Sequence, residues 1–89
     1  MAMVTLRYWA AAKDAAGVAE QVIAADNLAA ALAQAGTAAV RARLAPVLER
    51  SSFLVNGTQV GRRAAETVQL PEGAVIEVWW PVTITWNWA

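Results

Sequence analysis

Apolar and polar residues alternate along several short stretches of the chain, which is typical of half-buried β-strands. The first stretch runs from Met3 to Trp9, and its pattern predicts two faces. The core face would carry Val4, Leu6 and Tyr8, and the opposite face Thr5, Arg7 and Trp9. Further strands are predicted at 20–24, 52–55, 58–60 and 74–80.

Helical signals occupy the segments between these strands. Residues 10–16 are rich in alanine, the best helix former, and Gly17 is expected to stop that helix after one or two turns. Asp26 or Asn27 is a suitable N-cap for a second helix. Its apolar positions fall on one face, and Gly36 is expected to end it; these positions are Leu28, Ala31, Leu32 and Ala35.

A third helix is expected after Thr37, whose side chain could cap it. The spacing places four apolar residues inward, namely Val40, Leu44, Val47 and Leu48. The outward residues are Arg41, Arg43, Glu49 and Arg50. Pro46 lies late in this segment and is expected to end or kink the helix, because proline lacks a backbone N–H.

Two turns are marked by their residue types. Asn56-Gly57 separates two apolar strands and predicts a type I′ hairpin, which requires positive φ at both positions. Pro71-Glu72-Gly73 predicts a second turn before the last strand. Between them, 61–67 is a polar connection and 68–70 a brief extended piece.

The residues after Pro81 alternate again. Val82, Ile84, Trp86 and Trp88 are separated by Thr83, Thr85 and Asn87. Period two with β-branched and aromatic residues predicts an added strand, which needs a sheet edge to pair with. Three destinations are open: its own sheet, a second copy of the chain, or the sheet of another protein.

Composition narrows the classes of function. The chain has no cysteine or histidine, so thiolate chemistry and the commonest zinc ligand are excluded, and no catalytic residue, metal or cofactor is expected. Seven basic and seven acidic residues form no basic patch, which disfavours nucleic acid as a partner. No apolar run approaches the roughly 20 residues of a membrane span, and the start lacks a signal-peptide core. These features favour a cytoplasmic globular protein.

Three local sequences resemble the MoaD/ThiS family of ubiquitin-like sulfur carriers. "VTLRYWAAAKDAAG" resembles the opening strand and helix of that family, "SSFLVNGTQV" its central hairpin, and "LPEGAVIEVWWPV" its closing turn and strand. The resemblance spans 3–82 and is stronger toward the small subunit of molybdopterin synthase than toward the thiamine branch. It implies an α+β, β-grasp domain over 3–81, with a mixed sheet packed on one main helix. The alternation after Pro81 adds a strand-forming tail over 82–89.

The resemblance also implies a carrier or small-subunit role, not an enzyme. Such proteins end in Gly-Gly, which an E1-like activating enzyme adenylates before sulfur is installed and delivered to a partner such as the large subunit of molybdopterin synthase. Here Ile84-Thr85 fall where the glycine pair is expected, and the chain contains no Gly-Gly. Two β-branched residues would obstruct a channel shaped for glycine, so we expect no sulfur-carrier activity.

In a β-grasp sheet, the first and last domain strands lie side by side at the centre. Their outer face would then bring Arg7 beside Glu77, in position to pair, and Trp9 beside Trp79 as an aromatic patch. In the resembled family, matching positions help contact the partner enzyme, whereas here the tail could instead cover them. The predicted partner interface therefore comprises Arg7, Trp9, Glu77, Trp79, Val82, Ile84, Trp86 and Trp88.

An alternative function belongs to another class. The chain could be an engineered or diverged interaction module whose C-terminal strand mediates self-assembly or strand-addition binding. Retained binding of an activating or synthase enzyme would favour the carrier-like hypothesis. Oligomers that depend on 82–88 would favour the interaction module.

Overall fold

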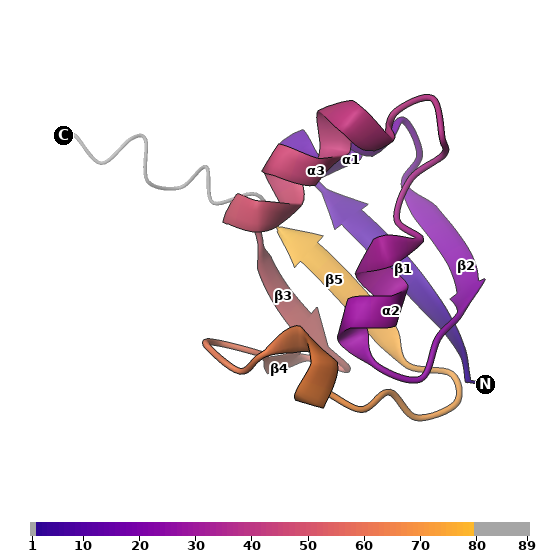
Figure 1. Ribbon diagram of the computed structural model, residues 1–89, viewed down its shortest axis with the longest axis vertical. Coiled ribbons are helices and arrows are strands. Elements are labelled where there is room, and N and C mark those ends of the chain that lie inside the picture. The colour runs from indigo at the N-terminus through magenta and orange to yellow at the C-terminus, as the bar shows by residue number, and fades with distance from the viewer. Residues whose placement is uncertain (1, 80–89) are drawn as a thin grey trace, which may run out of the picture.

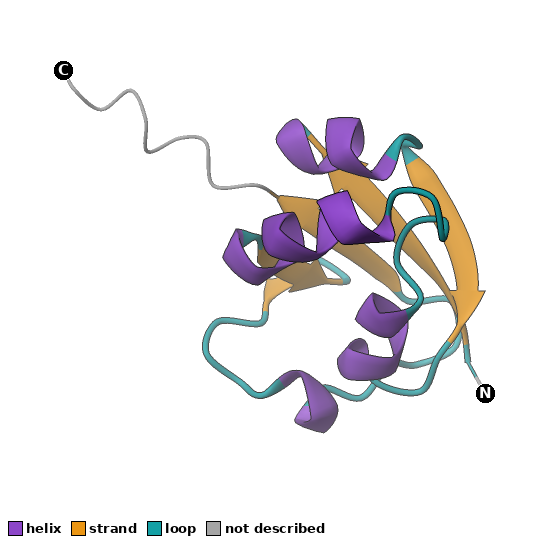
Figure 2. Ribbon diagram, turned by 45° about the horizontal axis from the view of Figure 1, so that its top comes forward, coloured by secondary structure: helices purple, strands orange, loops and turns teal. Residues whose placement is uncertain are grey.

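The computed structural model describes residues 2–79, which form a five-stranded sheet with helices on one face (Figures 1 and 2). In chain order the elements are β1 (Met3–Trp9), α1 (Ala11–Ala16), β2 (Glu20–Ala24), α2 (Leu28–Ala33), α3 (Arg41–Arg50), β3 (Ser52–Val55), β4 (Thr58–Gln59), the 3-10 helix η1 (Ala65–Thr67) and β5 (Val75–Trp79). The predicted C-terminal strand at 82–88 lies outside the described residues.

The strand order is β2-β1-β5-β3-β4, with β5 at the centre. β1 pairs antiparallel with β2 and parallel with β5, and β3 pairs antiparallel with both β4 and β5. This mixed α+β sheet is the β-grasp arrangement, so the predicted fold class is confirmed. The helical layer is shared by three short helices rather than resting on one main helix, since α2 has only six residues.

The core lies between the sheet and the helices. Every second residue of β1 and β5 is buried, as the alternation predicts. The largest fully buried side chains are Val4, Leu6, Tyr8, Leu28, Leu44, Ile76 and Val78. Both strand faces are thereby assigned: one side meets the helices, and no helix of the described residues covers the other (Figure 1).

Local signals position most of the elements. Asn27 caps α2, because its Oδ1 accepts from the Ala30 N–H at 2.8 Å. Asn56 and Gly57 both have positive φ, 50° and 84°, which confirms the predicted turn. Gly17 ends α1 in the left-handed conformation, as predicted.

Two helix-boundary predictions are wrong. α2 ends at Ala33, before Gly36, and α3 begins after Val40 with no side-chain cap from Thr37. Of the two outcomes expected at Pro46, an end or a kink, the end does not occur, because α3 continues four residues beyond it to Arg50. Pro46 removes one N–H whose acceptor would be the carbonyl of Ala42, and both residues are exposed, so water can satisfy that carbonyl.

Candidate functional site

The candidate site is the helix-free face of the sheet. Residues that alternate with the core positions point to it, and the strand register arranges them in rows across the sheet. One row contains Glu20, Arg7, Glu77 and Leu54, and the next contains Trp9, Trp79 and Ser52. We call this surface the open face.

Two stacked tryptophans dominate one end of the open face. Trp9 ends β1 and Trp79 ends β5, and the parallel register places them directly opposite each other. Their ring centroids are 5.0 Å apart and the planes differ by 9°. They remain 37% and 38% exposed, so a partner could still cover a large apolar area. The predicted aromatic patch is thus present in the structure.

Further apolar residues lie on the open face beyond this pair. Of the large hydrophobic residues exposed in the described part of the chain, Met3 and Val22 also lie on it, in register with Ala24 and Thr5. Scattered exposed apolar residues carry little meaning, but several on one surface indicate an interaction site. Four of the five large exposed apolar residues of the described chain, Met3, Trp9, Val22 and Trp79, thus lie on the open face.

The predicted ion pair of Arg7 with Glu77 is wrong, because Arg7 pairs with Glu20 instead. Arg7 Nε donates to Glu20 Oε2 at 2.9 Å, and within residues 2–79 this is the only salt bridge. Arg7 has a carboxylate residue opposite it on each neighbouring strand, Glu20 on β2 and Glu77 on β5. The guanidinium pairs with the carboxylate on the edge strand, so the Glu77 carboxylate has no ion pair within residues 2–79.

The remaining predicted interface residues cannot be placed. Val82, Ile84, Trp86 and Trp88 lie outside the described residues, so their contribution stays a prediction.

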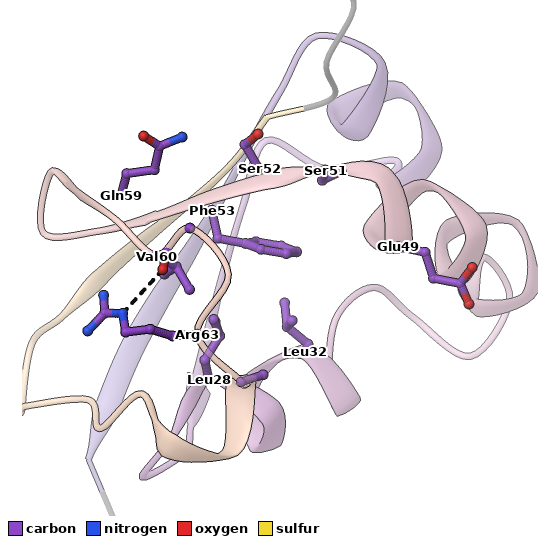
Figure 3. Close-up of a pocket in the computed structure, with 11 residues that line it drawn as sticks. Leu28, Leu32, Glu49, Ser51, Ser52, Phe53, Gln59, Val60 and Arg63 are labelled. Carbon is purple, nitrogen blue, oxygen red and sulfur yellow. Dashed lines mark hydrogen bonds between the residues drawn. The ribbon is translucent and has the colours of Figure 1, made fainter.

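A pocket of about 270 Å³ lies on the other side of the molecule, between α2, β3 and the connection after β4 (Figure 3). Leu28, Leu32 and Phe53 form its apolar wall. Arg63 and Glu49 lie at opposite ends of it, and Arg63 Nε donates to the Val60 carbonyl at 3.2 Å. Sequence patterns did not indicate this pocket, because the polar connection carries no periodicity that relates it to α2.

A buried polar cluster fixes the loop after α2. The Tyr8 hydroxyl donates to Gln21 Oε1 at 2.8 Å, and the Gly36 N–H donates to both oxygens, at 3.2 and 2.8 Å. Burial raises the pKa of Tyr8, while the Gly36 hydrogen bond and the charge of Arg41 act in the opposite direction. These groups are satisfied by one another, so the cluster is structural.

The described part of the chain contains neither a cluster of metal ligands nor a membrane-spanning helix. Between residues 2 and 79, no three acidic side chains gather closely enough to hold a metal ion. None of the helices placed there is long and apolar enough to span a membrane.

Comparison with known proteins identifies the fold. No family model matches the sequence, and no curated protein matches it either. A solved structure from Pyrococcus furiosus, described as "Putative molybdopterin converting factor, subunit 1", superposes with a TM-score of 0.66. The match covers 92% of this chain and 100% of that one at 21% identity. This chain therefore shares the β-grasp fold of that structure over nearly its whole length.

Proposed function

We propose that this protein is a MoaD/ThiS-like small subunit that binds a partner enzyme through its open face without carrying sulfur. Two independent lines support the family assignment: the three local sequences that resemble the family, and the fold shared with a structure described as a molybdopterin converting factor subunit. The observation that carries the binding role is the stacked, half-exposed pair of Trp9 and Trp79 on a face without helices.

The open face combines the features of an interface centre and its rim. Tryptophans are enriched among residues that dominate binding energy, and here the sheet holds both rings in place before binding. Below them, Glu77 offers a carboxylate without an ion pair among the described residues. A partner that presents an apolar pocket next to an Arg or Lys would match both features. By the resemblance, this partner is an E1-like activating enzyme or the large subunit of molybdopterin synthase.

The absence of carrier activity follows from two side chains. Ile84 and Thr85 stand where the resembled family has glycines. Glycine lets a chain pass a narrow channel and adopt any φ, whereas β-branched residues are bulky and restrict the backbone. The protein would therefore occupy a partner surface without delivering sulfur.

Calorimetric titration into a molybdopterin-synthase-type large subunit tests the binding role. Trp9→Ala and Trp79→Ala should each weaken binding by about tenfold or more, the effect of losing a central aromatic contact. Glu49→Ala is the control, because Glu49 is exposed and lies on α3, on the helical side of the sheet. Binding that is absent, or equally sensitive to Glu49→Ala, contradicts the proposal.

The carrier question has its own test. The chain is incubated with ATP and an E1-like activating enzyme, and its intact mass is measured with a Gly-Gly carrier in parallel. We expect no adenylate or thiocarboxylate on this chain. A variant that combines Ile84→Gly with Thr85→Gly and ends at position 85 should regain modification if these two side chains are the obstacle.

A second candidate function is an interaction module that assembles through 82–88. The alternation of that segment favours it, and so does a free sheet edge in the described structure. A concentration series by light scattering tests this candidate: it requires an oligomer that Ile84→Pro abolishes.

A further inference from the structure

The edge strand β2 offers unpaired backbone groups in a fixed pattern. The bonds Tyr8 N–H to Ala19 O and Ala25 N–H to Ala2 O, at 2.9 and 2.8 Å, bracket its ladder with β1. Bonded and non-bonded pairs alternate in an antiparallel ladder. Counting inward from both bonds places Gln21 and Ile23 at bonded positions.

Glu20, Val22 and Ala24 then point their N–H and C=O groups away from β1, toward the free edge. The Ala24 carbonyl accepts from Gln34 Nε2 at 2.7 Å. Among residues 2–79, the outward backbone groups of Glu20 and Val22 have no hydrogen-bond partner. β2 therefore presents at least four free main-chain groups in the spacing that an added strand requires.

The side chains of this edge do not protect it. Proteins usually guard edge strands with lysine, proline, bulges or a covering element. β2 contains no lysine and no proline, and its only charged residue, Glu20, is paired with Arg7. Its apolar residue Val22 is 65% exposed. The opposite edge strand, β4, has only two residues. Within the described sheet, β2 is the one edge long enough to accept a strand.

We propose that the β2 edge binds residues 82–88 of a second copy of this chain as an added strand. This proposal rests on the second candidate function, and it identifies β2 as the strand with which 82–88 would pair. The donor segment alternates apolar and polar residues and contains no charge or proline. Its apolar side chains would continue the open face beside Val22, while its threonines and asparagine would lie on the opposite side.

The distance between β5 and the free edge of β2 favours a second copy over the same chain. β5 lies two strands from β2. At a strand spacing of about 4.8 Å, a tail must cross roughly 14 Å to reach the outer side of β2. That crossing uses about four extended residues at ~3.3 Å each, so within one chain residues 82 and 83 would be spent on the crossing and could not pair with β2. A second copy can offer the whole of 82–88, and two copies can exchange tails symmetrically.

Amide hydrogen exchange on the full-length protein, combined with light scattering, tests this assignment. In an oligomer formed through β2, the Val22 amide should be protected from exchange. In the Ile84→Pro variant the protein should be monomeric and Val22 should exchange at least tenfold faster. Gln21 and Ile23 are internal controls, because their amides bond to β1 and should stay protected in both proteins.

A substitution on the acceptor side completes the test. Val22→Pro removes an outward N–H and leaves the β1 ladder intact, since proline is tolerated at edge positions whose N–H faces solvent. It should shift the mass to monomer, whereas Val22→Thr should remain an oligomer. Exchange at Gln21 and Ile23 reports whether the Val22→Pro sheet is intact.

The outcomes separate the two levels of the proposal. A monomer at every concentration, with Val22 exchanging freely, overturns both the second candidate function and the β2 assignment. An oligomer that Ile84→Pro abolishes while Val22 exchanges freely overturns only the β2 assignment. A monomer with a protected Val22 shows pairing within one chain and overturns the second copy as occupant.

Discussion

Gly36 is the position where a single methyl group should damage the fold most clearly. Its φ is 73°, in the left-handed region. A Cβ added there would lie 2.8 Å from Leu44 Cδ2 and 3.0 Å from Val40 Cγ2. Leu44 is fully buried, so it has little room to move. The Gly36 N–H also holds Tyr8 and Gln21, and any backbone shift would strain that cluster.

The cost of Gly36→Ala has two parts. The left-handed conformation costs alanine about 1–2 kcal/mol, and overpacking a dense core adds roughly 1–3 kcal/mol. Alanine also lowers the conformational entropy of the unfolded chain, which offsets about 0.4–1 kcal/mol of this cost. We therefore expect a net loss of about 2–3 kcal/mol, a large part of the roughly 4–13 kcal/mol expected for a chain of this length.

Gly57→Ala is the matched control. Gly57 has a φ of 84°, but a Cβ there would meet nothing within 4 Å. It should lose only the conformational part, about 1 kcal/mol or less. Urea unfolding followed by circular dichroism measures both variants against the parent, with equal m-values as the condition for comparison. Equal losses at the two sites would refute the claim that packing around Leu44 sets the cost.

Three further predictions concern stability. Burial raises the pKa of the Tyr8 hydroxyl in the folded protein. The contribution of Tyr8 to stability should therefore be fully present below the ordinary tyrosine pKa of about 10 and be lost as the pH rises toward the raised value. Tyr8→Phe should lower the free energy of unfolding by about 1–2 kcal/mol at neutral pH, because the Gly36 N–H loses one of its acceptors. In urea titrations, the stability of this variant should also fall less at alkaline pH. Ala10 has φ 52° and ψ −128°, a strained conformation for alanine, so Ala10→Gly should raise the thermal midpoint by the equivalent of about 1 kcal/mol, and a lowered midpoint would contradict this. Glu20→Gln should cost less than about 1 kcal/mol because its pair with Arg7 is exposed, and the difference should shrink further in about 1 M salt.

The sequence predicted the strands and turns because their signals are local. Alternation from Met3 to Trp9 assigns both faces of β1, and Asn56-Gly57 determines its own turn geometry. Helix boundaries were less predictable, because packing in the core decides where α2 ends. Pro46 shows the limit of a local rule, since its missing N–H concerns an exposed carbonyl that water can satisfy.

The site was only partly predictable for a related reason. The resemblance implied that the first and last strands lie side by side, and their pairing brings Trp9 and Trp79 together. It could not select the partner of Arg7, because Glu20 and Glu77 both lie opposite it in the register. The direction of the Val22 amide, toward β1 or toward the free edge, depends on which residues of β2 bond to β1. That pattern follows from the hydrogen bonds of the folded sheet and cannot be inferred from the sequence.

The central claim is that the open face binds a partner enzyme. Indole N–H resonances test it most directly, once each is assigned by a Trp→Phe substitution in the ¹⁵N-labelled full chain. Adding an unlabelled molybdopterin-synthase-type large subunit should shift or broaden the signals of Trp9 and Trp79, while the amides of Leu32 and Arg63 in the pocket on the other side stay unchanged. Changes confined to that pocket, with both indole signals unaffected, would contradict the account.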